Sequence, residues 1–439
     1  KAYRVLAMAS KHKGNLKDEK NMVFVGLVGM IDPPREEAEA AVMHFKGAHV
    51  DTVMITGDHV DTAYAIARDL GIARDREECM TGAEIDGLKD EEFAEKVENI
   101  RVFARVSPEH KVRIVEALKA KGKVVAMTGD GVNDAPSLKA ADVGIAMGKE
   151  GTDVARSAAD LVLTDDNFAT IEKAMKEGRG IYENIRKTIL FLLSSNFGEI
   201  ITMLAAVLAG FPTPLKASHI LWINLITDSL PALALGVDKN DGEALMKEPP
   251  RKSSDSLFSH GGLACTLCYG VVIGCISLLA FVTVPYQELL RNNLPVTIQN
   301  LEKMLRLPFV LNKAQTHAFT VLGMSQLMHA VGMRDVNRSI FRMNHLENVY
   351  MLIAWAAGIV LQALVTEIPY FVSLFGTSRL SLGEWASLGA LASMPLVVHE
   401  LLVLSKALQS KAPENAKALE KTHKSQNHEN SGPQPGEVM

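Results

Sequence analysis

The sequence predicts a soluble α/β domain followed by an all-α bundle of six membrane-spanning helices. Short apolar strands alternate with helical segments over residues 1–180, and this alternation is typical of a parallel sheet with helices on both faces. Residues 188–405 contain six apolar runs of about 20 residues, enough to cross a hydrocarbon core of ~30 Å. Glu199 and Asp228 lie inside these runs. Because a charged carboxylate in the hydrocarbon core is unfavourable in free energy, we interpret each as a candidate functional residue.

In the first 180 residues, strands are predicted where short apolar runs end at turn-forming residues. These runs are 5–9, 23–31, 50–55, 102–104, 124–127, 143–146 and 161–163. Helices are predicted between them, at 36–46, 62–70, 75–99, 108–121 and 137–141. In such a sheet, ligands bind at the carboxyl ends of the strands.

A helix starting at Phe168 is predicted to continue into the first membrane span. The six apolar runs are 188–210, 215–236, 262–284, 314–333, 348–369 and 382–405. Pro231 removes a helix hydrogen bond and is expected to kink the second span. Lysines and arginines flank the spans on one side, which predicts that residues 1–180 are cytoplasmic. Residues 406–439 are polar without periodicity and are predicted to be a disordered cytoplasmic tail.

The composition sets further bounds on function. The 439 residues are 48% hydrophobic, with a net charge of −5, and no basic stripe indicates a nucleic-acid partner. Cys265 and Cys268 form a C-x-x-C pair that would suit zinc or redox chemistry. The pair lies inside an apolar run without a second pair, which favours a packing role. Because the pattern begins abruptly at Lys1 without a signal peptide, we expect a truncated chain.

The stretch from Thr128 to Asp134, Thr-Gly-Asp-Gly-Val-Asn-Asp, is the strongest local signal for chemistry. Its glycines allow a tight turn close to a phosphate, and Asp130 and Asp134 offer oxygens suited to Mg²⁺. An acidic turn that uses glycine only for its geometry is the alternative. Thr56, at another strand end, and Lys111 add a hydroxyl and a positive charge of the kind that phosphoryl transfer requires. By itself, Lys111 would be read as a solvated helix lysine.

Several motifs in order resemble the C-terminal part of P-type cation-transporting ATPases of the class that includes calcium pumps. They are Asp32-Pro33-Pro34-Arg35, Met54 to Asp58, Arg105 to Lys111, Thr128 to Pro136, Asn196 to Glu199 and Trp222 to Asp228. The resemblance implies that residues 1–31 end a nucleotide-binding domain. It gives residues 32–180 a haloacid-dehalogenase-like fold and makes residues 181–405 the membrane domain.

Site roles follow from the same resemblance, residue by residue. It implies a catalytic group consisting of Thr56, Lys111, Asp130, Asn133 and Asp134. In this group, Thr56 and Lys111 would contact an aspartyl phosphate and Asp130 would hold Mg²⁺. It implies an ATP-binding group consisting of Arg4, Gly57, Asp58 and Arg105.

This chain departs from the family pattern in one large respect. The family forms its covalent intermediate on the aspartate of a D-K-T-G string, which is absent here, as is its T-G-E loop. The core of the nucleotide domain and the first four membrane helices are also missing. We therefore expect the chain alone to be inactive in ATP hydrolysis.

The membrane acids have polar neighbours at helical spacing. Residues three and four apart share a helix face, which groups Asn196 with Glu199, and Asn224 with Thr227 and Asp228. Polar contacts between helices would explain the amides and hydroxyls alone. The two added carboxylates favour a site for a transported cation. The resemblance agrees, because these positions match cation ligands of calcium pumps.

The identity of the ion remains open at this stage. Gln326 stands where a reticulum-type calcium pump has a ligating glutamate, which favours one Ca²⁺ per cycle, with proton counter-transport as an addition. A monovalent cation such as Na⁺, a non-catalytic membrane scaffold or partner subunit, and a phosphatase fused to membrane helices are the alternatives. His329, His399 and Glu400 are interpreted as helix-end or interhelical polar groups and not as ligands. We expect a monomeric protein of a bacterial plasma membrane, in contact with lipid, ATP and the cation.

Overall fold

The computed structural model describes residues 4–11, 22–30, 34–251, 255–259 and 261–405. Two compact units divide the chain. The soluble unit contains residues 1–180 and 240–255, and the membrane unit contains residues 181–239 and 256–439.

The soluble unit begins with an antiparallel ribbon. Strand β1 (Arg4–Ser10) pairs with β2 (Val23–Met30), and the register shifts between Met8 and Ala9. Both strands agree with the predicted ones. Their apolar side chains are largely exposed, for example Leu6 at 53% and Phe24 at 64%. A two-stranded ribbon is marginally stable by itself.

Two three-stranded parallel sheets follow, where one sheet was predicted. The first has the order β3 (Met54–Ile55), β5 (Val102–Ala104) and β4 (Cys79–Thr81). The second has the order β6 (Ala126–Gly129), β7 (Val143–Met147) and β8 (Leu161–Leu163). Because all pairs within each sheet are parallel, the carboxyl ends of its strands lie along a single edge.

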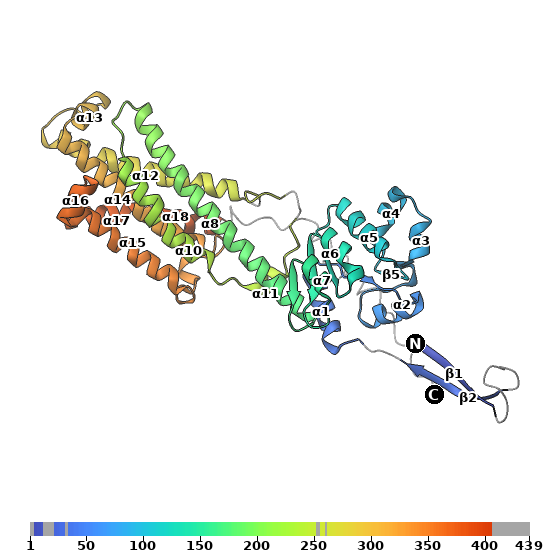
Figure 1. Cartoon of the computed structure of the whole chain (residues 1–439). Coiled ribbons are helices and arrows are strands. Elements are labelled where there is room, and N and C mark those ends of the chain that lie inside the picture. The colour runs from blue at the N-terminus through green and yellow to red at the C-terminus, as the bar shows by residue number, and fades with distance from the viewer. Residues whose placement is uncertain (1–3, 12–21, 31–33, 252–254, 260, 406–439) are drawn as a thin grey trace, which may run out of the picture. The chain divides into compact units, whose positions relative to one another are not determined.

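Helices surround these strands (Figure 1). They are α1 (Glu36–Gly47), α2 (Val60–Asp69), α3 (Gly82–Asp86), α4 (Asp90–Lys96), α5 (Pro108–Ala120), α6 (Ala135–Ala140) and α7 (Asp153–Ala158). The prediction of one helical segment at 75–99 was wrong. Strand β4 lies there because Cys79 and Met80 are buried against β5, and the capping box of Thr81 and Glu84 then starts α3.

The last part of the soluble unit joins distant segments. Helix α8 (Ala169–Leu208) begins here, and residues 240–248, which include α11 (Gly242–Met246), bind its first turns. Arg179 donates hydrogen bonds to the carbonyl oxygens of Leu245 at 2.7 Å, Glu248 at 2.8 Å and Ala48 at 3.0 Å. Its guanidinium therefore links α8 to α1 and to the segment around α11.

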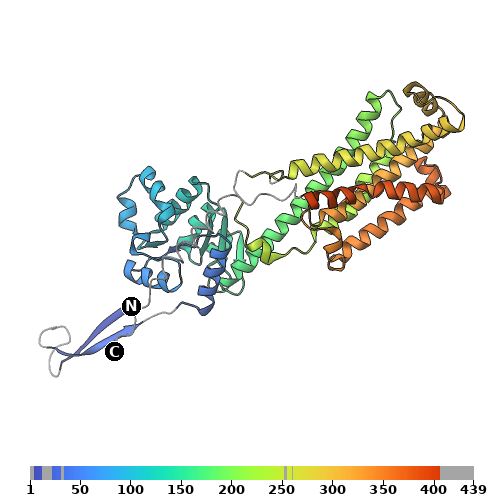
Figure 2. The ribbon, with the colours of Figure 1, turned by 180° about the vertical axis from the view of Figure 1, so that it is seen from behind.

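The membrane unit is a helical bundle whose long helices run side by side (Figures 1 and 2). After α8 come α9 (Ala217–Trp222), the π-helical turn η4 (Ile223–Thr227), α10 (Ser229–Gly236), α12 (Gly262–Arg291), α14 (Pro308–Met333), α15 (Val349–Glu367), α17 (Leu382–Ala392) and α18 (Met394–Ser405). The short helices α13 (Ile298–Leu305) and α16 (Pro369–Phe375) lie in its loops. The predicted continuity of the helix from Phe168 into the first span is confirmed, since α8 is one helix of 40 residues.

Within the described residues, four segments are long and apolar enough to span a membrane: Ala169–Leu208, Gly262–Arg291, Val349–Glu367 and Leu382–Ser405. The predicted second span is divided into α9, η4 and α10. The predicted fourth span, α14, places polar side chains such as His317, Gln326 and His329 inside the bundle. These two segments therefore fall short of the length or hydropathy that marks a span.

One end of the bundle has a buried ion pair. The Arg334 guanidinium donates from Nε and Nη2 to the two carboxylate oxygens of Asp238, each at 3.0 Å. Asn348 Nδ2 donates to Asp238 Oδ1 at 2.9 Å, and Asn184 Nδ2 donates to the Asp238 carbonyl oxygen at 2.8 Å. This network joins α8, the end of α10, α14 and the start of α15.

Candidate functional site

A pocket of about 390 Å³ lies at the carboxyl ends of the soluble unit's strands. Strand β3 contributes Ile55, β7 contributes Met147, and Asp166 follows β8. The end of β6 contributes Thr128, Gly129 and Asp130. The pocket thus gathers strand ends from both sheets, as the sequence rule for ligand sites requires.

Lys111 and Asp134 form the electrostatic centre of this pocket. Lys111 Nζ donates to Asp134 Oδ1 at 2.5 Å, and the backbone N–H groups of Asp130 and Gly131 donate to Asp134 Oδ2 at 3.2 and 3.1 Å. Burial would raise the pKa of Asp134, but these hydrogen bonds and the Lys111 charge hold it below its usual value. Gly129 leaves room for this arrangement, since a Cβ there would lie 2.5 Å from Asp134 Cβ.

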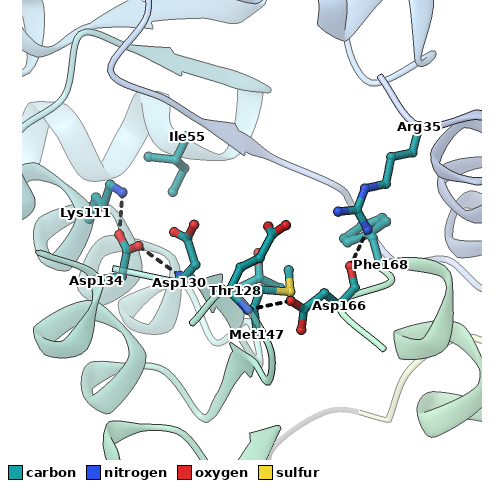
Figure 3. Close-up of a pocket in the computed structure, with 11 residues that line it drawn as sticks. Arg35, Ile55, Lys111, Thr128, Asp130, Asp134, Met147, Asp166 and Phe168 are labelled. Atoms are coloured by element: carbon teal, nitrogen blue, oxygen red, sulfur yellow. Dashed lines mark hydrogen bonds and ion pairs between the residues drawn. The ribbon is translucent and has the colours of Figure 1, made fainter. Parts of the chain in front are cut away.

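The donor groups of this centre fit Mg²⁺. Asp130 is exposed and its carboxylate lines the same pocket as Asp134. Figure 3 shows Asp130, Asp134 and Lys111 together on one side of the pocket. Hard carboxylate oxygens suit a magnesium ion that also binds a phosphate, and the Lys111 charge suits the phosphate itself.

Arg35 and Asp166 form the other side of the pocket (Figure 3). Arg35 Nη1 donates to the Asp166 carbonyl oxygen at 2.6 Å, and Asp166 adopts a positive φ of 53°. The Asp166 carboxylate accepts the N–H groups of Gly148, Lys149 and Glu150 at 2.6 to 2.9 Å. The pKa of the Asp166 carboxyl group is lowered, and the hydrogen bond from the Lys149 N–H is the largest cause.

Sequence reasoning did not assign Arg35 or Asp166 to the site. Arg35 belongs to a recognised motif, but no chemistry was attached to it. Asp166 lies three residues after the end of the predicted strand at 161–163. The rule that gathers strand ends at one edge could therefore have found it.

Thr56 and three of the residues assigned to ATP binding form a separate cluster. Thr56 Oγ1 donates to Asp58 Oδ2 at 3.2 Å and accepts the Asp58 N–H at 3.1 Å. The Arg105 N–H donates to the Asp58 carbonyl oxygen at 3.1 Å, and Arg105 adopts a positive φ of 50°. Gly57 is exposed between them. The cluster touches the pocket through Ile55, the neighbour of Thr56.

Two predicted residues lie apart from these groups. Asn133 is exposed on the short helix η3 (Val132–Asp134) and does not line the pocket. The backbone of Arg4 belongs to β1, and its side chain lies outside the described residues.

In the membrane unit, four of the predicted cation ligands are buried. The exposed fractions are 7% for Glu199, 0% for Thr227, 1% for Asp228 and 0% for Gln326. They come from α8, η4 with the residue after it, and α14. Glu199 and Asp228 lie close enough for their charges to interact, and Gln326 lies beside Glu199.

The two predicted asparagines lie at the rim of this group. Asn196 and Asn224 are exposed in this chain. Asn224 Nδ2 donates to Glu199 Oε2 at 3.4 Å, whereas no described hydrogen bond joins Asn196 to the acids. Asn196 and Glu199 were expected to share one helix face. In the structure only Glu199 is buried in the bundle, whereas Asn196 is exposed.

Several buried oxygens in this group lack a hydrogen-bond partner among the described residues. They are Glu199 Oε1 and both carboxylate oxygens of Asp228, and the Gln326 amide is unpartnered at both of its polar atoms. Buried polar atoms are nearly always partnered in folded proteins, so this cluster of exceptions is a candidate ligand site. Cations with oxygen ligands satisfy such groups.

The π-helical turn η4 directly precedes Asp228. The Asp228 N–H donates to the Ile223 carbonyl oxygen at 2.9 Å, a bond that spans five residues. Pro231 has no N–H to offer the Thr227 carbonyl oxygen one turn later. The predicted irregularity of this span is therefore present as a widened turn, a feature that often marks functional sites.

The histidines and the cysteine that the sequence analysis singled out within the predicted spans contact side chains of other helices. His329 Nε2 lies 2.7 Å from Ser194 Oγ, and His399 contacts the Tyr269 hydroxyl at 3.2 Å. Cys265 packs with its sulfur 4.0 Å from that of Met333. No cluster of three or more His, Cys, Asp or Glu side chains suited to a metal ion occurs within the described ranges. These contacts agree with the packing roles expected from the sequence.

Comparison with known families matches both units. Residues 6–142 match the haloacid dehalogenase-like hydrolase family, and residues 212–404 match the family described as cation transporting ATPase, C-terminus. The chain belongs to the P-type cation-transporting ATPases. The haloacid-dehalogenase-like fold expected for the soluble unit is confirmed.

Curated relatives of this P-type ATPase chain are named calcium-transporting ATPases. One from Bacillus cereus is 50% identical over 411 residues, covering 92% of this chain and 46% of that protein. One from Bacillus subtilis is 44% identical over 390 residues, covering 88% and 42%. A mouse relative, calcium-transporting ATPase type 2C member 1, is 37% identical over 413 residues, covering 94% and 42%. The chain thus spans less than half the length of these relatives.

Proposed function

We propose that this chain forms the C-terminal part of an ATP-driven pump that exports Ca²⁺ from the cytoplasm. The carrying observation is the buried group of Glu199, Asp228 and Gln326, whose unpartnered oxygens come from separate helical segments of the membrane unit. The names of the relatives support Ca²⁺ as the cargo. The phosphorylated aspartate would lie in a part of the complete pump that this sequence does not contain.

The soluble unit supplies the surroundings of that phosphoryl group. Asp130, with Asp134 beside it, would hold Mg²⁺, which neutralises phosphate charge when bound. The Lys111 ammonium, already fixed by Asp134, would stabilise negative charge on the phosphoryl oxygens. Thr56 would donate a hydroxyl hydrogen bond, with Asn133 as a supporting residue.

ATP would approach from the side of the Thr56 cluster. We assign its contacts to Arg4, Gly57, Asp58 and Arg105. Arg105 has a left-handed backbone conformation, and its N–H donates a hydrogen bond to the Asp58 carbonyl oxygen. This hydrogen bond joins Arg105 to the turn that contains Gly57 and Asp58. The ribbon of β1 and β2 would belong to the end of the nucleotide-binding domain.

Helix α8 would couple phosphoryl transfer in the soluble unit to cation transport in the membrane unit. It begins in the soluble unit, where Arg179 binds the segment around α11, and it carries Glu199 in the membrane unit. Because it is one uninterrupted helix, a displacement of its first turns is transmitted to Glu199.

The membrane topology completes the proposal. Six spans, with α9 to α10 and α14 added to the four long apolar helices, would place residues 1–180 in the cytoplasm of a bacterial cell. The exposed Asn196 and Asn224 would be covered by further helices of the complete, monomeric pump. A neutral Gln326 beside two acids favours one Ca²⁺ per cycle.

Uptake of radioactive calcium by vesicles containing the complete pump tests this function. We expect ATP-dependent uptake that is abolished by Asp228→Asn and strongly reduced by Glu199→Gln. Glu302→Gln, on the short helix α13, is the matched control and should leave uptake unchanged. Uptake that survives Asp228→Asn would overturn the site, uptake of Na⁺ in place of Ca²⁺ would overturn the cargo, and no ATP-driven transport would favour a scaffold.

A further inference from the structure

Gln362, on α15, is a buried amide that the proposed function leaves unused. Its exposed fraction is 0%, and its Nε2 donates to Thr320 Oγ1 on α14 at 3.4 Å. Its Oε1 has no hydrogen-bond partner among the residues that the structure describes. Leaving a buried acceptor unpartnered costs about 1–3 kcal/mol, so a missing partner is expected.

The packing of α14 against α15 determines where this oxygen lies. A Cβ placed at Gly358 would lie 2.6 Å from Leu327, and one placed at Gly323 would lie 3.3 Å from Gln362 Oε1. The same Cβ at Gly323 would lie 4.0 Å from Thr227 Cγ2. The absence of a side chain at Gly323 thus leaves Gln362 Oε1 and the Thr227 methyl group facing the same glycine, beside the π-helical turn that leads to Asp228.

We propose that the transported-cation site extends to α15, where Gln362 Oε1 is an additional oxygen ligand on the Thr227 side. This inference rests on the proposed function and adds a ligand to it. Ca²⁺ takes six to eight oxygens, including side-chain amides, and the two acids with Gln326 and Asn224 leave room for more. An amide that only joined two helices would have partners at both ends, whereas Gln362 has one at its nitrogen alone.

Gln362→Ala in the complete pump tests the ligand role through two measurements. Equilibrium binding of radioactive calcium should weaken about tenfold, the size expected for one oxygen to a charged partner. The melting temperature in EDTA should fall no more than it does in Gln315→Ala, because both variants leave a similar cavity and Gln362 gives up only its hydrogen bond to Thr320. A fall of the EDTA melting temperature with Ca²⁺ affinity changed less than about twofold would overturn the proposal in favour of helix packing.

Gln315→Ala is the matched control. Gln315 is a buried glutamine of α14 whose Nε2 donates to the Thr213 carbonyl oxygen at 2.8 Å. Its loss should lower the melting temperature in EDTA and leave Ca²⁺ affinity unchanged. A loss of affinity equal to that of Gln362→Ala would count against a specific ligand.

Gly323→Ala provides a second and independent variant. The added methyl group displaces Gln362 Oε1, so we expect weaker Ca²⁺ binding that disappears when Gln362 is already alanine. Equal effects in both backgrounds would contradict the proposal. Asp228→Asn in the same assay separates the two ideas: if it abolishes binding while Gln362→Ala does not weaken it, only the extension to α15 fails.

Discussion

Asp134 is the residue on which the soluble site depends most. It accepts the Lys111 ammonium with one carboxylate oxygen and two backbone N–H groups with the other. A protonated carboxyl group would lose much of this hydrogen bonding, because its remaining acceptor strength is lower. The shape of the turn after β6 is therefore tied to the charge of a single side chain.

Acid should open this turn. The folded-state pKa of Asp134 is lowered, so its contribution to stability is complete above the unfolded-state value of about 3.9 and is lost as the pH falls through the lower folded-state pKa. We expect amide protection at Asp130 and Gly131 to decrease below about pH 4, as measured by hydrogen exchange and corrected for intrinsic rates. In Asp134→Asn this part of the pH dependence should be absent, and a variant with the wild-type profile would contradict the assignment.

The π-helical turn η4 is the element whose shape matters most for the cation. The wider turn changes which side chains point into the bundle, and it immediately precedes Asp228. An uninterrupted α-helix would rotate Asp228 relative to Glu199 on α8. The geometry of the site therefore depends on a local departure from regular helix.

Pro231→Ala should convert this turn toward regular α-helix. The new N–H can donate to the Thr227 carbonyl oxygen, so we expect a higher melting temperature together with a Ca²⁺ affinity lowered about tenfold. Calcium binding and thermal unfolding of the complete pump measure the two effects. Pro285→Ala, inside α12, is the control: it should also stabilise the helix, with Ca²⁺ binding unchanged.

Some elements are predicted well by the sequence and others are not. Strand 102–104 and the helix at 108–121 were predicted closely, because apolar residues and a proline start mark them clearly. Strand β4 was missed, since its three residues lie within an acidic, helix-favouring stretch and form a strand only by pairing with β5. The division into two sheets likewise depends on contacts between segments far apart in sequence.

The same distinction applies to the sites. Lys111, Asp130 and Asp134 were predicted together from a motif, and the structure places them in one pocket. Asp166 and Gln362 were missed, because their meaning depends on which groups surround them after folding. A glutamine in an apolar helix has no signal in the sequence until the residue facing its oxygen is known.

At the scale of the whole molecule, one arginine joins three segments of the soluble unit. Arg179 binds carbonyl oxygens of α1 and of the segment around α11, and the nearby Lys176 ammonium forms an ion pair with Glu243. The segment 240–255 lies between two predicted spans in the sequence. Through its contacts with α8, this loop between two membrane segments belongs to the soluble unit.

Arg179→Ala should release this segment. It removes three hydrogen bonds to carbonyl oxygens, so we expect hydrogen exchange of Ala244 to Glu248 to become at least about tenfold faster. Lys173→Ala, on an earlier turn of α8, is the control and should leave that exchange unchanged. In the complete pump, calcium binding should persist while ATP-driven uptake falls; unaltered uptake would show that the attachment has no part in coupling.

The Asp238–Arg334 pair has a consequence for how the bundle is made. Its two charges lie 96 positions apart in the sequence, so Asp238 is synthesised and enters the membrane region well before its guanidinium partner. Until Arg334 and Asn348 arrive, the carboxylate lacks the three hydrogen bonds that these two residues donate to it. The complete network therefore requires α8, the end of α10, α14 and the start of α15 to be in place together, so this end of the bundle can be finished only late in synthesis.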